Sequence, residues 1–242
     1  IDAWANSSDE RGPARAEQIM KKMDELSKLG DQDLQPNTRT FSAVINAYAK
    51  SSNKGSASKA EQLLAEMEQR SKKEIHLKPN TITYNTVINA LAKSGEQGAV
   101  LRADRLLSSM QKQHEEGNKF VKPDAVTYTS VINACAFSKH PDDRKDAFEI
   151  AFRVFKQMTL KEVTPNAVTY TSLLNVYRNC LSTTDKENRF LLSQYLFKEC
   201  SKAGFVNDYV LGALKKVVTK EQYIQLVGSG EQNSSNLPSV WT

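Results

Sequence analysis

The sequence is poor in cysteine and in long apolar runs, and each shortage excludes a class of protein. Its 242 residues include three cysteines, Cys135, Cys180 and Cys200, an odd number with no CxxC pair. Two of them fall within apolar helical patterns, so we expect reduced, buried thiols in an intracellular compartment rather than a disulfide framework. No apolar run approaches the ~20 residues that a membrane-spanning helix needs.

The chain also lacks the residue clusters that hold metals or perform catalysis. His76, His114 and His140 are scattered through connecting segments, whereas a zinc site needs clustered ligands. There is no Gly-rich phosphate loop, no HExxH motif and no paired Cys/His set. The sequence therefore predicts a protein that is not an enzyme, with no cofactor, no metal and no small-molecule substrate.

Charge alone decides little. The sequence has 33 basic and 28 acidic residues, a net charge of +5 and a pI near 9.0. A mildly basic balance permits a polyanionic partner without requiring one, and ordinary solvated helix surfaces also account for it.

What the sequence does contain is one segment in four copies. Each copy has apolar residues at i, i+3, i+4 and i+7, which places them on one face of a helix. A proline followed by asparagine or aspartate marks the start and the N-cap of that helix. The copies are PNTRTFSAVINAYAK from Pro36, PNTITYNTVINALAK from Pro79, PDAVTYTSVINACAF from Pro123 and PNAVTYTSLLNVYRN from Pro165.

A second helical pattern lies between these copies. It has a small residue at its head, an apolar pair in its middle and usually a methionine at its end. Two helices in every unit predict an all-α solenoid that grows by stacking helix–turn–helix repeats. The second pattern reads AEQIMKKM from Ala16, AEQLLAEM from Ala60, ADRLLSSM from Ala103 and AFRVFKQM from Ala151, with SQYLFKEC from Ser193 as a degraded copy.

The spacing of the copies predicts the domain layout. Residues 1–5 match residues 45–49, so the chain begins within a unit and any targeting segment would lie upstream. A solenoid over 1–227 is expected to be followed by a disordered, Gly/Ser/Asn-rich tail over 228–242. The solenoid divides into a partial repeat 1–37, repeats 38–80, 81–124, 125–166 and 167–208, and capping helices over 209–227.

These units resemble the pentatricopeptide repeat family, most closely in KPNTITYNTVINALAKSG at 78–95. The resemblance covers nearly the whole chain, although these units are longer than the family's ordinary P-type repeat. It implies a right-handed α-α superhelix that binds single-stranded RNA, one base per repeat, in processing, stability, editing or translation of transcripts in a mitochondrion or plastid. A protein-binding scaffold of the tetratricopeptide kind stays open as the alternative.

The resemblance also implies which residues read bases. One reader is the small polar residue five positions after each capping Asn or Asp, where a hydroxyl or amide meets a base edge. The other is the capping residue itself, because Asp only accepts hydrogen bonds whereas Asn also donates. Plain helix capping is the alternative role for these caps. The first set is Ser42, Asn85, Thr129 and Thr171, and the second is Asn37, Asn80, Asp124, Asn166 and Asp208.

The family's pairing rule turns these residues into a preferred RNA sequence. Ser42 with Asn80 implies adenine and Asn85 with Asp124 implies uracil. Thr129 with Asn166 implies adenine, and Thr171 with Asp208 implies guanine. Asn37 alone favours adenine or cytosine, so the expected preference is near 5′-(A/C)AUAG-3′.

Two further sets are expected to hold the RNA without reading it. A side chain two residues after each cap is expected to stack between bases, or else only to pack at the helix start. Lys50 and Lys93, further along the first helices, are expected to meet phosphates or simply to be solvated. The stacking set is Arg39, Ile82, Val126, Val168 and Val210.

Overall fold

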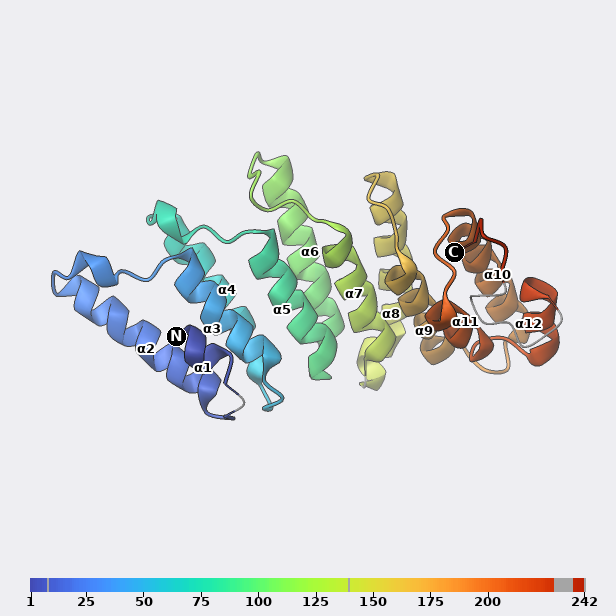
Figure 1. Cartoon of the computed structure of the whole chain (residues 1–242), viewed down its shortest axis with the longest axis horizontal. Helices are drawn as coiled ribbons and strands as arrows, with labels where there is room; N and C mark the ends of the chain where they lie inside the picture. Colours follow the sequence, from blue (N-terminus) through green and yellow to red (C-terminus); the bar gives the residue numbers. More distant parts are fainter. Residues whose placement is uncertain (8, 139, 229–236, 242) are drawn as a thin grey trace. The chain divides into compact units, whose positions relative to one another are not determined.

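The protein is built from α-helices. The structure, a computed structural model, describes residues 1–7, 9–138, 140–228 and 237–241. These residues form twelve α-helices and two short 3-10 helices, with no strand among them. They belong to two compact units, residues 1–123 and 124–242, whose helices are labelled in Figure 1. The predicted all-α fold of helix–turn–helix repeats is therefore confirmed.

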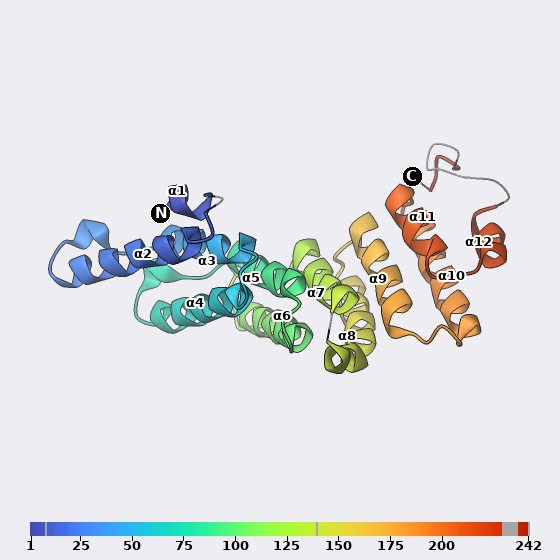
Figure 2. The ribbon, with the colours of Figure 1, turned by 90° about the horizontal axis from the view of Figure 1, so that it is seen from below.

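The first unit contains three helix pairs. Its first helices are α1 (Asp2–Ala5), α3 (Thr38–Lys50) and α5 (Thr81–Ser94); its second helices are α2 (Gly12–Lys28), α4 (Ser56–Ser71) and α6 (Ala99–Glu115). The 3-10 helices η1 (Gln32–Leu34) and η2 (Ile75–Leu77) lie in the loops after α2 and α4. Helix α3 packs against α1, α4 and α5, and α5 also packs against α6, so the first helices form one row (Figure 2).

The second unit repeats this arrangement. Its first helices are α7 (Ala125–Phe137), α9 (Ala167–Cys180) and α11 (Asp208–Lys215). Its second helices are α8 (Pro141–Leu160), α10 (Lys186–Lys202) and α12 (Lys220–Val227). Helix α9 packs against α7 and α11 in its own row and against α8 and α10 behind it.

The same positions fill the core in every repeat. The fourth residue of each full-length first helix is a buried aromatic, and the methionine that ends the apolar pattern of α4, α6 and α8 is buried as well. Since burial of such side chains stabilises a fold by about 1.5–3 kcal/mol each, this repeated pattern accounts for the stacking. The aromatics are Phe41, Tyr84, Tyr128 and Tyr170, and the methionines are Met67, Met110 and Met158. In α2 the buried methionine is Met20, three residues earlier, whereas Met23 at the matching position is half-buried.

Threonine hydroxyls in the first unit hold the long loops that lengthen the repeats. Thr38 Oγ1 donates to the carbonyl oxygens of His76 at 2.8 Å and Lys78 at 3.1 Å. Thr81 Oγ1 makes the matching bonds to Phe120 at 3.2 Å and Lys122 at 2.9 Å. The loop that leads into the next repeat is therefore fixed to the first residue of the preceding first helix.

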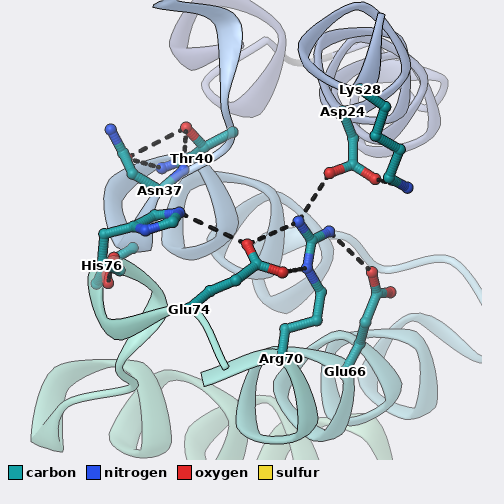
Figure 3. A network of polar contacts seen from close by, with 9 residues as sticks. Asp24, Lys28, Asn37, Thr40, Glu66, Arg70, Glu74 and His76 are labelled. Atoms are coloured by element: carbon teal, nitrogen blue, oxygen red, sulfur yellow. Dashed lines mark hydrogen bonds and ion pairs between the residues drawn. The ribbon is translucent and has the colours of Figure 1, made fainter. Parts of the chain in front are cut away.

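An ion-pair network joins α2 to α4 (Figure 3). The Arg70 guanidinium of α4 lies 2.7 Å from Asp24 of α2, 3.1 Å from Glu74 and 3.7 Å from Glu66. It also lies over the Phe41 ring of α3, 5.5 Å from the ring centroid. One half-buried cation thus connects three helices of the first unit.

Replacing Arg70 by alanine should destabilise the first unit by about 2–3 kcal/mol, because hydrogen bonds to charged groups contribute roughly that much and Asp24 and Glu74 lose their shared cation. Chemical denaturation followed by circular dichroism measures this loss. Lys22→Ala is the control, since Lys22 and Glu25 form an exposed pair that contributes at most about 1 kcal/mol. If both substitutions lower the stability equally, Arg70 does not stabilise the first unit through its ion pairs.

The end of the chain lies against α10. Residues 237–241, expected in a disordered tail, form a turn in which the Trp241 ring meets Phe197 edge-on, with centroids 5.5 Å apart. The Trp241 carbonyl accepts a bond from the backbone N–H of Val206 at 2.7 Å. A terminal aromatic thus finds an apolar partner that a Gly/Ser/Asn-rich composition does not reveal. Residues 229–236 and 242 of the predicted tail lie outside the described residues.

Candidate nucleic-acid interface

Every first helix from α3 to α11 begins with a side-chain cap. In each case a side-chain oxygen of the capping residue accepts the backbone N–H of the third helical residue, at 2.9–3.1 Å. Such a bond satisfies one of the free N–H groups at a helix start. The capping role left open by the sequence is therefore confirmed. The caps are Asn37, Asn80, Asp124, Asn166 and Asn207.

Capping uses only one of the two polar atoms on each of these side chains. Oδ1 of Asn80 accepts from the backbone N–H and the hydroxyl of Thr83, at 3.0 and 3.1 Å. Oδ1 of Asn166 accepts from the same two groups of Thr169, at 3.0 and 3.2 Å. Because the oxygen is fixed by donors, the other amide atom must be the Nδ2 donor group. Capping of these helices therefore occupies Oδ1 and not Nδ2.

The structure moves the last cap by one residue. The sequence placed Asp208 in this role, but Asn207 accepts the Val210 N–H at 3.1 Å and has extended backbone geometry, with φ −139°. Asp208 is the first residue of α11 and is exposed. The physical reason is that asparagine and aspartate cap almost equally well, so an Asn-Asp pair leaves the register open and the backbone decides it.

Because the cap of α11 is Asn207, the prediction that Val210 stacks between bases is wrong as well. Val210 is 0% exposed, since it fills the core position that Thr83 and Thr169 hold in other first helices, and it cannot reach a base. Tyr209 occupies the position two residues after the cap and is 80% exposed. An exposed aromatic ring therefore takes the place that the sequence assigned to a valine.

The other side chains two residues after a cap are exposed too. Ile82 is 73% exposed, Val126 58% and Val168 54%. Arg39 has an exposed side chain whose guanidinium lies 3.4 Å from Asp2. Packing at the helix start therefore leaves more than half of each of these three apolar residues exposed.

The residues five after the caps lie deeper. Ser42, Asn85 and Thr171 are half-buried, whereas Thr129 is only 7% exposed. The Thr171 hydroxyl donates to the Ala167 carbonyl at 2.8 Å. These four residues are therefore only partly exposed, and Thr129 is the least exposed of them.

Comparisons with known proteins agree with this geometry. Residues 36–93 and 79–137 match the sequence model of the PPR repeat family. The chain is also similar in structure to the pentatricopeptide repeat protein PPR10 in complex with an 18-nt psaJ RNA element, and to a cysteine-to-serine variant of that protein with the same RNA element. Both similarities have a TM-score of 0.59 at 19% identity, covering 95% of this chain and 30% of that one. No curated protein sequence matches the chain.

This chain contains pentatricopeptide repeats over residues 36–137. It spans less than a third of the length of the solved structures it matches. Their likeness establishes the fold of this pentatricopeptide repeat chain. The matched family segments run through α3, α5 and α7, the helices whose caps and exposed side chains are described above.

The predicted phosphate ligands are exposed on the first helices of the pentatricopeptide repeats. Lys50 and Lys93 lie in the last turns of α3 and α5, and Lys50 Nζ donates to Asn6 Oδ1 at 3.0 Å. Phe137 and Asn179 hold the equivalent places in α7 and α9. The basic positions are therefore confined to the first unit.

Sequence reasoning missed a second polar row in these repeats. The ninth residue after the cap is asparagine in all four copies, and none of the four is buried. Asn133 accepts the Ser172 hydroxyl at 2.6 Å. The sequence did contain a signal for this row, because the same polar residue stands at this position in all four copies. The row consists of Asn46, Asn89, Asn133 and Asn175.

The cysteines do not form a reactive site. Cys135 and Cys200 are buried, Cys180 is half-buried, and none of the three forms a disulfide. Burial raises the pKa of Cys200 to about 12, so this thiol stays protonated near neutral pH and is a poor nucleophile.

Within residues 1–7, 9–138, 140–228 and 237–241, no three His, Cys, Asp or Glu side chains gather as metal ligands would. No helix in that part of the chain combines the length and the apolar character of a membrane span.

Proposed function

We propose that this pentatricopeptide repeat chain binds single-stranded RNA along its first helices, one base per repeat. The observation that carries the proposal is the row of exposed side chains two residues after each cap, led by Tyr209 and Ile82. Exposed apolar side chains at one repeated helix position are suited to stacking against bases. PPR10, which shares this fold, was solved in complex with an RNA element.

Specificity would come from the atoms that capping leaves available. The Oδ1 atoms of Asn80 and Asn166 are occupied by the cap bonds, so the Nδ2 donor group is the atom of each side chain that would meet a base. Aspartate in that place presents an acceptor instead, which matches a different base edge. The Asn/Asp exchange between repeats therefore changes hydrogen-bonding character without changing the cap.

The corrected register changes one base of the expected RNA. Thr171 now pairs with Asn207 instead of Asp208, and the family's rule gives adenine in place of guanine for this pair. The other pairings are retained, so the proposed preference becomes 5′-(A/C)AUAA-3′. The biological role we propose is selection of a transcript in a mitochondrion or plastid for processing, stability, editing or translation.

Fluorescence anisotropy with labelled RNA tests this function. RNA that contains 5′-AAUAA-3′ should bind at least tenfold more tightly than RNA with 5′-UUGUU-3′ in that place, since each mismatched base costs about 1–3 kcal/mol in specific readout. Equal affinities would contradict base reading. Binding of an apolar peptide but no RNA would favour the scaffold alternative.

Salt dependence adds an independent prediction. Contacts of Lys50 and Lys93 with two phosphates should give a slope of log affinity against log salt of about −1.4, since each contact contributes about −0.7 for single strands. Replacing both lysines by glutamine should flatten this slope without changing base preference. If the double replacement leaves the slope unchanged, the RNA phosphates do not contact Lys50 and Lys93.

A further inference from the structure

A threonine links the two predicted base readers of a repeat in each unit. In the first unit, Thr83 Oγ1 lies 3.2 Å from Ser42 Oγ and donates to Asn80 Oδ1 at 3.1 Å. Its two neighbours are the pair expected to read one base, and they come from successive first helices, α3 and the cap of α5.

The second unit repeats the link. Thr169 Oγ1 lies 2.8 Å from Thr129 Oγ1 and donates to Asn166 Oδ1 at 3.2 Å. The hydrogen bond between the two threonines is buried. Two repeats with different reader residues therefore share the same three-residue chain of side-chain oxygens.

Counting protons fixes the direction of each hydrogen bond. A threonine hydroxyl carries one proton, and a carboxamide oxygen can only accept. Because Thr83 gives its proton to Asn80, Ser42 must donate its own proton to Thr83. By the same reasoning Thr129 donates to Thr169. The hydroxyl oxygens of Ser42 and Thr129 have then donated their protons, so toward a base they can only accept a hydrogen bond.

We propose that Thr83 and Thr169 are positioning residues that make their reader pairs present one acceptor and one donor, the hydroxyl oxygen and the amide Nδ2 group. This proposal rests on the proposed RNA-binding function. The pair complements the edge of adenine, where an amino donor lies beside a ring-nitrogen acceptor. The threonines touch no base themselves, and they act by orienting the groups that do.

Helix α11 shows what happens without the link. In α11 the equivalent residue is Val210, which has no hydroxyl, and Thr171 donates to the Ala167 carbonyl instead. Capping therefore does not require the link, which argues for a separate role.

The test replaces Thr83 by valine, which keeps the shape and removes the hydroxyl. Anisotropy is measured on RNAs that differ only at the base assigned to Ser42 and Asn80. Discrimination between adenine and the other bases should fall about tenfold, while affinity for the remaining bases of the site is kept. Thr83→Ser should restore discrimination because it returns the hydroxyl, and Thr169→Val should cause the same loss at its own base.

Thr159→Val is the control. It makes the same exchange on the second helix α8, where the Thr159 hydroxyl donates to the Lys156 carbonyl at 2.9 Å, so base discrimination should not change. If the wild-type chain discriminates while both Thr83→Val and Thr169→Val retain full discrimination, the inference is wrong. If the wild-type chain shows no discrimination at all, the proposed function itself fails. Thermal melting of each variant separates loss of fold from loss of selectivity.

Discussion

Replacing Tyr209 by alanine should weaken RNA binding by about fivefold to 150-fold with little change in stability. The ring is 80% exposed two residues after the last cap, where we propose that it stacks on a base. Base–aromatic stacking contributes about 1–3 kcal/mol per base, and 1.4 kcal/mol is a factor of ten in affinity. Anisotropy titration measures the change.

Two controls make this result specific. Tyr195 is 50% exposed on the second helix α10, so Tyr195→Ala should leave RNA affinity unchanged. Val210→Ala should lower stability by about 1–2 kcal/mol, because it removes buried methyl groups, and should leave affinity intact while the chain stays folded. If Tyr195→Ala and Tyr209→Ala weaken binding equally, the stacking row is wrong.

The second large effect is a change of base preference. Asn80→Asp should shift the base read with Ser42 from adenine to guanine, with a change in relative affinity of about tenfold to a hundredfold. The helix should stay capped, because aspartate accepts the Thr83 N–H as well as asparagine does. Competition between RNAs that carry adenine or guanine at this position measures the shift.

The control for this exchange is the cap of a second helix. Asp185 caps α10 through the Asn188 N–H at 3.3 Å, so Asp185→Asn changes a cap of similar chemistry away from the first helices. It should leave base preference unaltered. If Asn80→Asp also leaves preference unaltered while wild type discriminates, Asn80 is a cap and nothing more.

Much of the fold follows from local sequence signals. The period of the apolar residues and the Pro-Asn or Pro-Asp pairs predicted the first helices and four of their caps, because these signals act within a few residues. The register of α11 was not predictable in this way. Asn207 and Asp208 are both good caps, and only the backbone shows that Asn207 is the one used.

The candidate site depends more on distant contacts. The link from Ser42 to Thr83 joins residues 41 positions apart, and the link from Thr129 to Thr169 joins residues 40 apart. No local pattern predicts such a bond. The low exposure of Thr129 likewise results from packing between helices.

Photo-crosslinking tests most directly whether the RNA lies along the row of first helices. 4-Thiouridine is placed at successive positions of the bound RNA, and the crosslinked peptides are mapped by mass spectrometry. Crosslinks should fall in the first turns of first helices and advance from the Ile82 peptide to the Tyr209 peptide as the label moves along the strand. Crosslinks on the second helices, or a pattern that does not advance with the label, would contradict the proposed binding mode.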